Sequence, residues 1–150
     1  MTFKQAVEAI PHLGAAAFRR GIQALTAADR ARIECANSRA LSGSVNIDVS
    51  LQPAFPNDPR WDYAIGYRRG RETLFWVEVH PASQGDVAEV QNKFTWLKGW
   101  LTDDGETLRQ FEAQFIWISS GRTTFTQSSP TLRRLAQQGV RAVGRVLRIG

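Results

Sequence analysis

Apolar residues at helical spacing mark the first part of the chain. Residues 3–10 carry one apolar stripe and residues 13–25 a second one. Pro11 lies between the stripes and predicts a break between two helices. Thr26, followed by Ala-Ala-Asp, is typical of a helix N-cap and predicts a further short helix. Residues 1–40 are therefore expected to be mostly helical.

The pattern then changes from helical spacing to alternation. Residues 45–51 alternate apolar and polar side chains, which predicts a half-buried strand. After a proline-rich loop, residues 61–67 predict a second strand and residues 73–80 a third, joined by an Arg-Arg-Gly-Arg turn. The third strand is apolar on both faces up to Glu78, which predicts a central place in the sheet. Pro81 is expected to end it.

A helix, a strand and a last helix are predicted for the rest of the chain. Residues 87–101 carry one apolar stripe, which is typical of an amphipathic helix of about four turns. Residues 111–119 predict a fourth strand, which the preceding crossover helix allows to run parallel to its neighbour. A loop rich in Ser and Thr follows. Ser129 and Pro130 then predict the start of a last helix that continues to Leu147.

This order of elements predicts an α/β fold. Three strands in a meander, a helix, a strand and a helix favour a mixed central sheet flanked by helices, with extra helices at the N-terminus. No internal repeat, low-complexity tract or linker interrupts the order, so residues 1–150 are predicted to form one domain. Within it, residues 1–40 would form a helical part and residues 41–150 the α/β core.

Composition narrows the class of protein. The chain has 150 residues, is 43% hydrophobic and contains five Trp, which favours a folded domain. Nineteen Lys and Arg against 14 Asp and Glu give a formal net charge of +5, which favours an anionic partner, nucleic acid above all. The single cysteine, Cys35, excludes an internal disulfide and a thiolate metal cluster, and a cytoplasmic location is expected. Neither a secretory signal nor a membrane span is expected.

Three groups able to hold a metal ion come together on the predicted hairpin of residues 61–80. Asp62 begins one strand, and Glu78 lies near the end of the next. His80 points to the same face as Glu78, because side chains alternate along a strand. Metal-dependent phosphodiester cleavage needs convergent carboxylates that hold Mg²⁺ or Mn²⁺, and it profits from a cation beside the attacked phosphate. This hairpin is therefore the candidate site.

These residues resemble the PD-(D/E)xK nuclease-like superfamily, which has a restriction-endonuclease-like αβββαβ core. Asp62-Tyr-Ala-Ile, a basic hairpin, Phe-Trp-Val-Glu78-Val-His80 and the following helix, strand and helix match its order over nearly the whole chain. The 16 positions from Asp62 to Glu78 fall within the range of that superfamily. The resemblance implies a metal-dependent nuclease in which Asp62 and Glu78 are ligands of Mg²⁺ or Mn²⁺.

His80 stands where the superfamily has its catalytic lysine. Histidine is mostly neutral near pH 7, whereas lysine is a permanent cation. With metal bound, His80 would be a neutral ligand or a general base. A lysine can also come from the following helix, where Lys93 lies at one edge of the apolar stripe and Gln91 and Lys98 at the other. The superfamily often uses a Gln or Lys from this helix, which favours Gln91 or Lys93 in a supporting role.

Arginine and tryptophan side chains offer further contacts to nucleic acid. Arginines of the hairpin turn and of the predicted last helix are expected to contact phosphates. Trp61, Trp96 and Trp100 are candidates for stacking on unpaired bases, although such residues also pack in cores. The arginine candidates are Arg68, Arg69, Arg71, Arg133, Arg134 and Arg141.

Three functions are consistent with this sequence. The first is a metal-dependent nuclease that acts on DNA or RNA. The second, suggested by the missing lysine, is a catalytically inactive nuclease-like module that binds nucleic acid or a protein partner. The third is a structural subunit that forms a homodimer. Each candidate residue also has a purely structural interpretation. Asp62 and Glu78 can be ion-paired carboxylates, and His80 can be a strand-end residue. Lys93 and Lys98 can be solvated charges at the edges of the helix.

Overall fold

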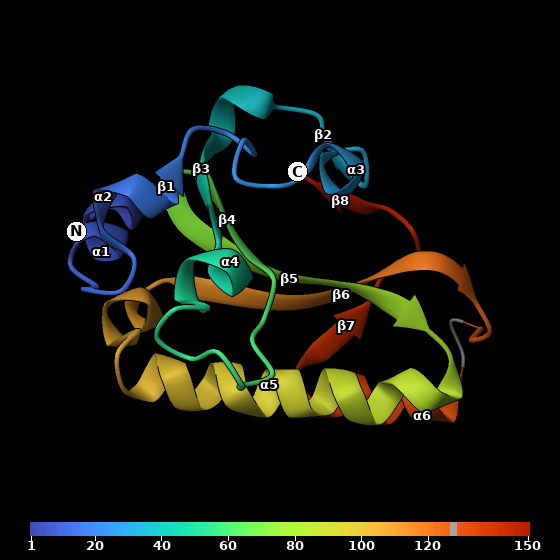
Figure 1. The fold of residues 1–150 in the computed structure, drawn as a ribbon. Helices are drawn as coiled ribbons and strands as arrows, with labels where there is room; N and C mark the ends of the chain where they lie inside the picture. Colours follow the sequence, from blue (N-terminus) through green and yellow to red (C-terminus); the bar gives the residue numbers. More distant parts are fainter. Residues whose placement is uncertain (127–128) are drawn as a thin grey trace.

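A mixed six-stranded sheet in the order β1-β3-β4-β5-β6-β7 forms the centre of the structure, with helices on its faces (Figure 1). The structure, a computed structural model, describes residues 1–126 and 129–150. The predicted α/β fold with a mixed sheet flanked by helices is therefore confirmed. A separate pair of short parallel strands, β2 (Ile33–Cys35) and β8 (Leu147–Ile149), lies near the C-terminus (Figure 1). Within the described ranges, no helix has the length and apolar character needed to cross a membrane.

The sheet consists of an antiparallel meander followed by a parallel crossover. Strands β3 (Leu41–Asn46), β4 (Tyr63–Arg69) and β5 (Arg71–Ala82) pair antiparallel in chain order. Helix α5 (Val87–Thr102) then crosses over, and β6 (Glu112–Thr123) returns parallel to β5. Both the parallel direction of β6 and the central place of β5 were predicted from the sequence and are confirmed.

Short elements complete the two edges of the sheet and its surroundings. β1 (Phe18–Arg19) pairs antiparallel with β3, and β7 (Val140–Ala142) pairs parallel with β6. Helices α5 and α6 lie along one face of the sheet, and α3 with β2 and β8 lies on the other (Figure 1). The remaining helices are α1 (Phe3–Glu8), α2 (Gly14–Ala17), α3 (Ala27–Arg30), α4 (Ile47–Leu51) and α6 (Pro130–Gln138), with 3-10 turns at Ser38–Ala40, Gln84–Asp86 and Glu106–Gln110.

Alternation along the strands divides the core between the two faces of the sheet. Trp76 of β5 belongs to the cluster that contains Phe94 of α5. The next residue, Val77, belongs to the opposite cluster, which contains Leu147 of β8. Because side chains alternate along a strand, Glu78 lies on the face of Trp76 and points toward α5. The candidate site is therefore located between β5 and this helix.

The N-terminal part is less helical than predicted. The stripe expected to form a helix over residues 13–25 gives only the four-residue α2, after which the chain enters β1. Gly14, the first residue of α2, has φ 66°, and Gly21, which follows β1, has φ 53°. A right-handed helix cannot continue through either conformation, so one helix cannot span residues 13–25. The predicted N-cap at Thr26 is confirmed, since its side chain accepts the N–H of Asp29 at 3.2 Å.

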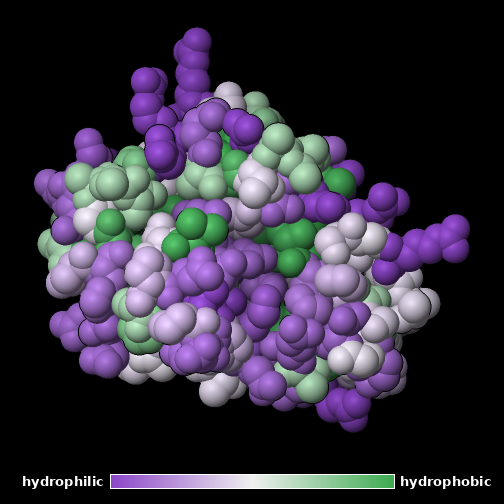
Figure 2. Space-filling view, viewed as in Figure 1, coloured by the Kyte–Doolittle hydropathy of each residue, from purple (hydrophilic) through white to green (hydrophobic). Residues whose placement is uncertain are grey.

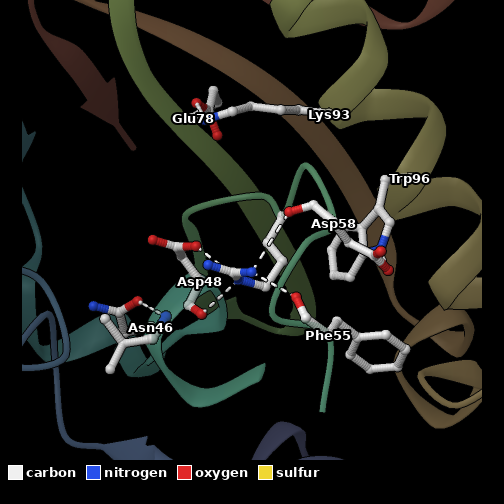
Figure 3. Close-up of polar contacts among 9 residues, drawn as sticks. Asn46, Asp48, Phe55, Asp58, Glu78, Lys93 and Trp96 are labelled. Atoms are coloured by element: carbon white, nitrogen blue, oxygen red, sulfur yellow. Dashed lines mark hydrogen bonds and ion pairs between the residues drawn. The ribbon is translucent and has the colours of Figure 1, made fainter. Parts of the chain in front are cut away.

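The strand predicted at residues 45–51 is wrong in its position. The strand covers Leu41–Asn46, and Ile47–Leu51 form the short helix α4. The Asn46 side chain accepts the N–H of Val49 at 3.0 Å and caps this helix (Figure 3). Val49, one of the apolar residues of the alternating pattern, is 62% exposed. The local side-chain cap, which alternation does not reveal, therefore decided the structure of this segment.

Both parallel strands extend further than predicted. Pro81 does not end β5, which continues to Ala82 opposite Thr123 of β6. The register shifts between His80 and Ala82, so that Pro81, which has no N–H, is left out of the ladder. Of the Ser- and Thr-rich loop predicted to follow the fourth strand, residues 127 and 128 lie outside the described residues.

The last helix is shorter than predicted. It begins at Pro130 as expected but ends at Gln138 instead of near Leu147. Gly139 adopts a left-handed conformation, with φ 117°, which is typical of a helix C-cap. The chain after it forms β7 and β8, so the arginine at position 141 lies on a strand. The predicted placement of Arg141 on the last helix is therefore wrong, whereas Arg133 and Arg134 lie on this helix as expected.

Gly66 of β4 lies in close contact with the N-terminal helix. A Cβ at this position would overlap Ser42 Oγ and approach a ring carbon of the buried Phe3 to 2.6 Å. Gly66→Ala is therefore expected to destabilise the fold by about 1–3 kcal/mol, measured by urea unfolding. Gly99→Ala is the control: apart from the neighbouring residues and backbone of α5 itself, no described atom lies within 4 Å of its Cβ position, and stabilisation by about 0.5–1 kcal/mol is expected. Equal stability of Gly66→Ala and wild type would contradict this contact.

Candidate functional site

Asp62 and Glu78 come together on neighbouring antiparallel strands. Tyr63 pairs with Val77, and this register brings the preceding residue, Asp62, beside Glu78. Asp62 Oδ2 accepts the N–H of Val79 at 2.9 Å, which anchors this carboxylate to β5. The structure thus places the two predicted metal ligands side by side at the point where β4 begins.

Lys93 reaches the same place from helix α5. Its Nζ donates a hydrogen bond to Glu78 Oε2 at 2.7 Å (Figure 3). The side chain of Glu78 is 0% exposed and that of Lys93 is 19% exposed, so this ion pair is largely shielded from water. Of the two lysines that the sequence offered on this helix, Lys93 is therefore the one in contact with a predicted ligand.

Burial and mutual repulsion raise the pKa values of both carboxyl groups. Burial, followed by the negative charge of Asp62, raises the pKa of Glu78 to about 8, although Lys93 acts in the opposite direction. Burial raises the pKa of Asp62 to about 6, against the hydrogen bond from Val79 and the charge of Lys93. Burial is the largest single influence on Lys93 and lowers its pKa, but the carboxylates of Glu78, Asp62 and Glu89 together outweigh burial, so the pKa of Lys93 is raised. One lysine thus faces two carboxylates, and the cluster lacks one positive charge.

One carboxylate oxygen of Glu78 has no hydrogen-bond partner among the described residues. This atom, Oε1, is buried, whereas Oε2 accepts the bond from Lys93. Leaving a buried acceptor unsatisfied costs about 1–3 kcal/mol, and more for a charged group. A proton or a metal ion would satisfy it. Two neighbouring carboxylates are the hard oxygen ligands that Mg²⁺ and Mn²⁺ prefer, so the residues fit such an ion.

A network of polar contacts holds the loop that leads into Asp62. Arg60 Nε donates to Asp48 Oδ1 at 2.9 Å, and its Nη1 donates to the carbonyl oxygen of Phe55. Trp96 of α5 donates to Asp58 Oδ2 at 2.9 Å (Figure 3). The loop is therefore tied both to α4 and to α5, which keeps the start of β4 beside the helix that carries the lysine.

His80 faces α5, as alternation predicted, but it contacts other carboxylates. Its Nε2 lies 3.1 Å from Glu89 Oε2, and its Nδ1 lies 3.5 Å from Asp86 Oδ1. The polar partners of His80 are therefore Asp86 and Glu89 instead of Asp62 and Glu78. Sequence reasoning missed Glu89 as a site residue, although its position four residues before Lys93 places both on one face of the helix.

Gln91 and Lys98 make their contacts elsewhere. Gln91 Nε2 donates to Gln138 Oε1 of α6 at 3.0 Å. Lys98 Nζ lies 4.6 Å from the centroid of the Phe94 ring, in a cation–π contact. Of these three helix residues, Lys93 is therefore the one whose contacts are compatible with the predicted supporting role.

The predicted phosphate-binding arginines are exposed but belong to separate elements. Arg68, Arg69 and Arg71 flank the turn at Gly70. Their positions in the hairpin are six or seven residues from Glu78 along β5, which is about 20 Å for an extended strand. Arg133 and Arg134 lie on α6. Arg141 lies on β7 and donates a hydrogen bond to Gln114 Oε1 at 3.2 Å.

Most of the tryptophans are core residues. Trp61 and Trp100 are buried, so they offer no face to a base. Trp96 is half-buried and stacks on Trp100, with ring centroids 6.1 Å apart. The large hydrophobic residues that are exposed among the described ones are Met1 and Val49. The face shown in Figure 2 is mostly hydrophilic, with small separate hydrophobic patches, and offers no extended apolar surface for a second copy of the chain.

Comparisons with models of protein families, with curated proteins and with solved structures gave no match to this chain. Fold alone does not define activity. A function is therefore inferred from the positions and charges of Asp62, Glu78 and Lys93.

Proposed function

We propose that this protein is a metal-dependent nucleic-acid phosphodiesterase of the PD-(D/E)xK-like type. The observation that carries the proposal is the 2.7 Å contact between Lys93 Nζ and the Glu78 carboxylate, beside Asp62. Two carboxylates and one lysine are the side-chain types that the motif combines. Lys93 supplies from the helix the cation that His80 does not supply from the strand. The order β3-β4-β5-α5-β6, with β6 parallel to β5, supports a restriction-endonuclease-like core.

Each residue of the cluster has a role in this proposal. Asp62 and Glu78 would hold Mg²⁺ or Mn²⁺, and the bound ion would supply Lewis-acid polarisation of a phosphoryl oxygen. Glu78 would hold the ion in its ionised form, while Lys93 remains the neighbouring cation, 2.7 Å from Oε2. Lys93 would supply the cation that stabilises the negative charge developing on the attacked phosphate. The formal net charge of +5 supports a polyanionic substrate.

The direct test is cleavage of single- and double-stranded DNA and RNA with Mg²⁺ or Mn²⁺. We expect cleavage of at least one of these substrates, and we expect EDTA to abolish it. Calorimetric titration with each metal in the absence of substrate gives an independent measure of the site. Absence of both cleavage and metal binding would overturn the proposal.

Metal binding is expected to release protons near neutral pH. Because the pKa of Glu78 is about 8 and that of Asp62 about 6, the pair holds roughly one proton at pH 7, which the metal must displace. Calorimetry with Mn²⁺ in two buffers of different ionisation enthalpy measures the number released. We expect about one proton per ion at pH 7 and fewer at pH 9. The same heat in both buffers at pH 7 would contradict the raised pKa values.

A binding module without catalysis is the second candidate, and the complete burial of Glu78 favours it. A side chain with 0% exposure is less accessible to a metal than most ligands are. In this case, binding of nucleic acid or of a protein survives EDTA and Glu78→Gln, and a strong dependence on salt identifies nucleic acid as the partner. Appearance of metal-dependent cleavage in His80→Lys would indicate that the lysine on the strand was the missing group.

A further inference from the structure

A second set of ligand-type side chains lies beyond Glu78, where β5 ends. His80, Asp86 and Glu89 each offer one atom, and these atoms all lie within 4.8 Å of one another. They come from three consecutive elements: β5, the 3-10 turn after it and the first turn of α5. The exposed fraction of the side chain is 12% for His80, 20% for Asp86 and 60% for Glu89, so an ion can enter from solvent.

Both ring nitrogens of His80 face oxygen atoms that accept hydrogen bonds. Nδ1 lies 3.0 Å from the carbonyl oxygen of Pro81, which assigns the N–H to this nitrogen, because a carbonyl cannot donate. Nε2 then presents its lone pair to Glu89 Oε2 at 3.1 Å. Two lone pairs at this distance repel each other unless a proton or a metal ion lies between them. A backbone carbonyl bound to the other ring nitrogen is the arrangement found around metal-bound histidines.

Asp86 is held in place by the residue that begins the turn. Its Oδ2 accepts the N–H of Ser83 at 2.9 Å and the hydroxyl of Ser83 at 2.6 Å. Oδ1 remains directed at His80, 3.5 Å from Nδ1. Carboxylates that bind metals are commonly oriented by such hydrogen bonds to the non-ligating atom.

The charges of this set match a divalent cation. Two carboxylates and a neutral imidazole carry a formal charge of −2, which a divalent ion neutralises, whereas a proton on His80 leaves −1. An imidazole nitrogen together with carboxylate oxygens suits Zn²⁺ and related transition metals better than Mg²⁺, which prefers oxygen ligands alone. Three protein ligands also leave coordination positions for water.

We propose that His80, Asp86 and Glu89 form a binding site for a divalent transition metal such as Zn²⁺, separate from the Asp62 and Glu78 pair. The bound ion links the end of β5 to the first turn of α5, the two elements that carry Glu78 and Lys93. It therefore fixes the helix relative to the strand. This site goes beyond the proposed phosphodiesterase and does not depend on it.

Histidine NMR on the wild-type protein tests this site directly, because the chain contains only two histidines. Zn²⁺ is expected to shift the ¹⁵N resonance of His80 Nε2 strongly and to leave His12 unchanged. His12 is a suitable internal control, since it also lies near a carboxylate, 3.9 Å from Asp104. Equal small shifts of both rings, or a His80 ring that keeps both N–H groups in excess Zn²⁺, would overturn the proposal in favour of a simple ion pair.

Calorimetry with Zn²⁺ and matched variants separates the two metal sites. His80→Gln and Glu89→Gln are each expected to weaken Zn²⁺ binding by at least about tenfold. Glu112→Gln removes an exposed carboxylate on β6 and is expected to change nothing. Glu78→Gln removes a ligand of the first site only, so that Zn²⁺ binding at His80 persists even if the phosphodiesterase proposal fails. Zn²⁺ affinity that is unaffected by His80→Gln and Glu89→Gln would contradict the site.

Discussion

Lys93→Met is expected to reduce metal-dependent cleavage by about 10²–10³-fold, whereas Lys98→Met retains wild-type activity. Both substitutions remove one positive charge from α5, but only Lys93 contacts Glu78. The loss follows from removing the cation that stabilises the charge of the attacked phosphate. The measurement is the rate of cleavage at saturating metal, with the substrate that wild type cleaves best.

The carboxylate variants complete this comparison. Asp62→Asn and Glu78→Gln are each expected to reduce cleavage at least as much as Lys93→Met. Each substitution replaces a carboxylate ligand of the metal by an uncharged amide and keeps the side chain nearly the same shape. Calorimetry distinguishes the two roles: the carboxylate variants lose Mn²⁺ affinity, and Lys93→Met keeps or increases it. Equal losses of activity in Lys93→Met and Lys98→Met would show that overall charge, and not this site, supports cleavage.

Lys93→Met is also expected to destabilise the fold by about 3–5 kcal/mol at pH 9 and only slightly at pH 5. Removing the lysine leaves Glu78, with 0% exposure, without its cation. Below pH 6, protonation neutralises Glu78, and little is lost. At pH 9 the protein must either bury an uncompensated charge or hold a proton against the solution. Urea unfolding at the two pH values, followed by circular dichroism, measures the difference.

The sign of this pH dependence follows from the raised pKa values. The folded protein binds protons more tightly than the unfolded chain at Asp62 and Glu78, so their contribution to stability is present at low pH. It is lost as the pH rises through about 6 for Asp62 and about 8 for Glu78. Wild type should therefore lose stability over this range, and Glu78→Gln should lose less. A destabilisation by Lys93→Met that is the same at pH 5 and pH 9 would contradict this explanation.

Long periodic segments were predictable because many residues agree on one pattern. Two segments are of this kind. The apolar stripe over residues 87–101 predicted a helix, which is α5, and the apolar run before Glu78 predicted a strand, which is β5. Errors arose where one residue decided the local structure. The side chain of Asn46 capped a helix in a segment that alternates like a strand, and Gly139 ended a helix whose apolar spacing continued beyond it.

The sequence by itself determined that Asp62 and Glu78 would meet, because a tight hairpin and the alternation of side chains leave little choice of register or face. Only the tertiary structure decided which cation joins them. The rotation of α5 on the sheet depends on how Phe94 and Leu97 pack against residues from distant strands. That packing directs Lys93 to Glu78 and places Glu89 beside His80. Helical periodicity defines the apolar stripe but not the strand residue that each polar neighbour of the stripe will contact.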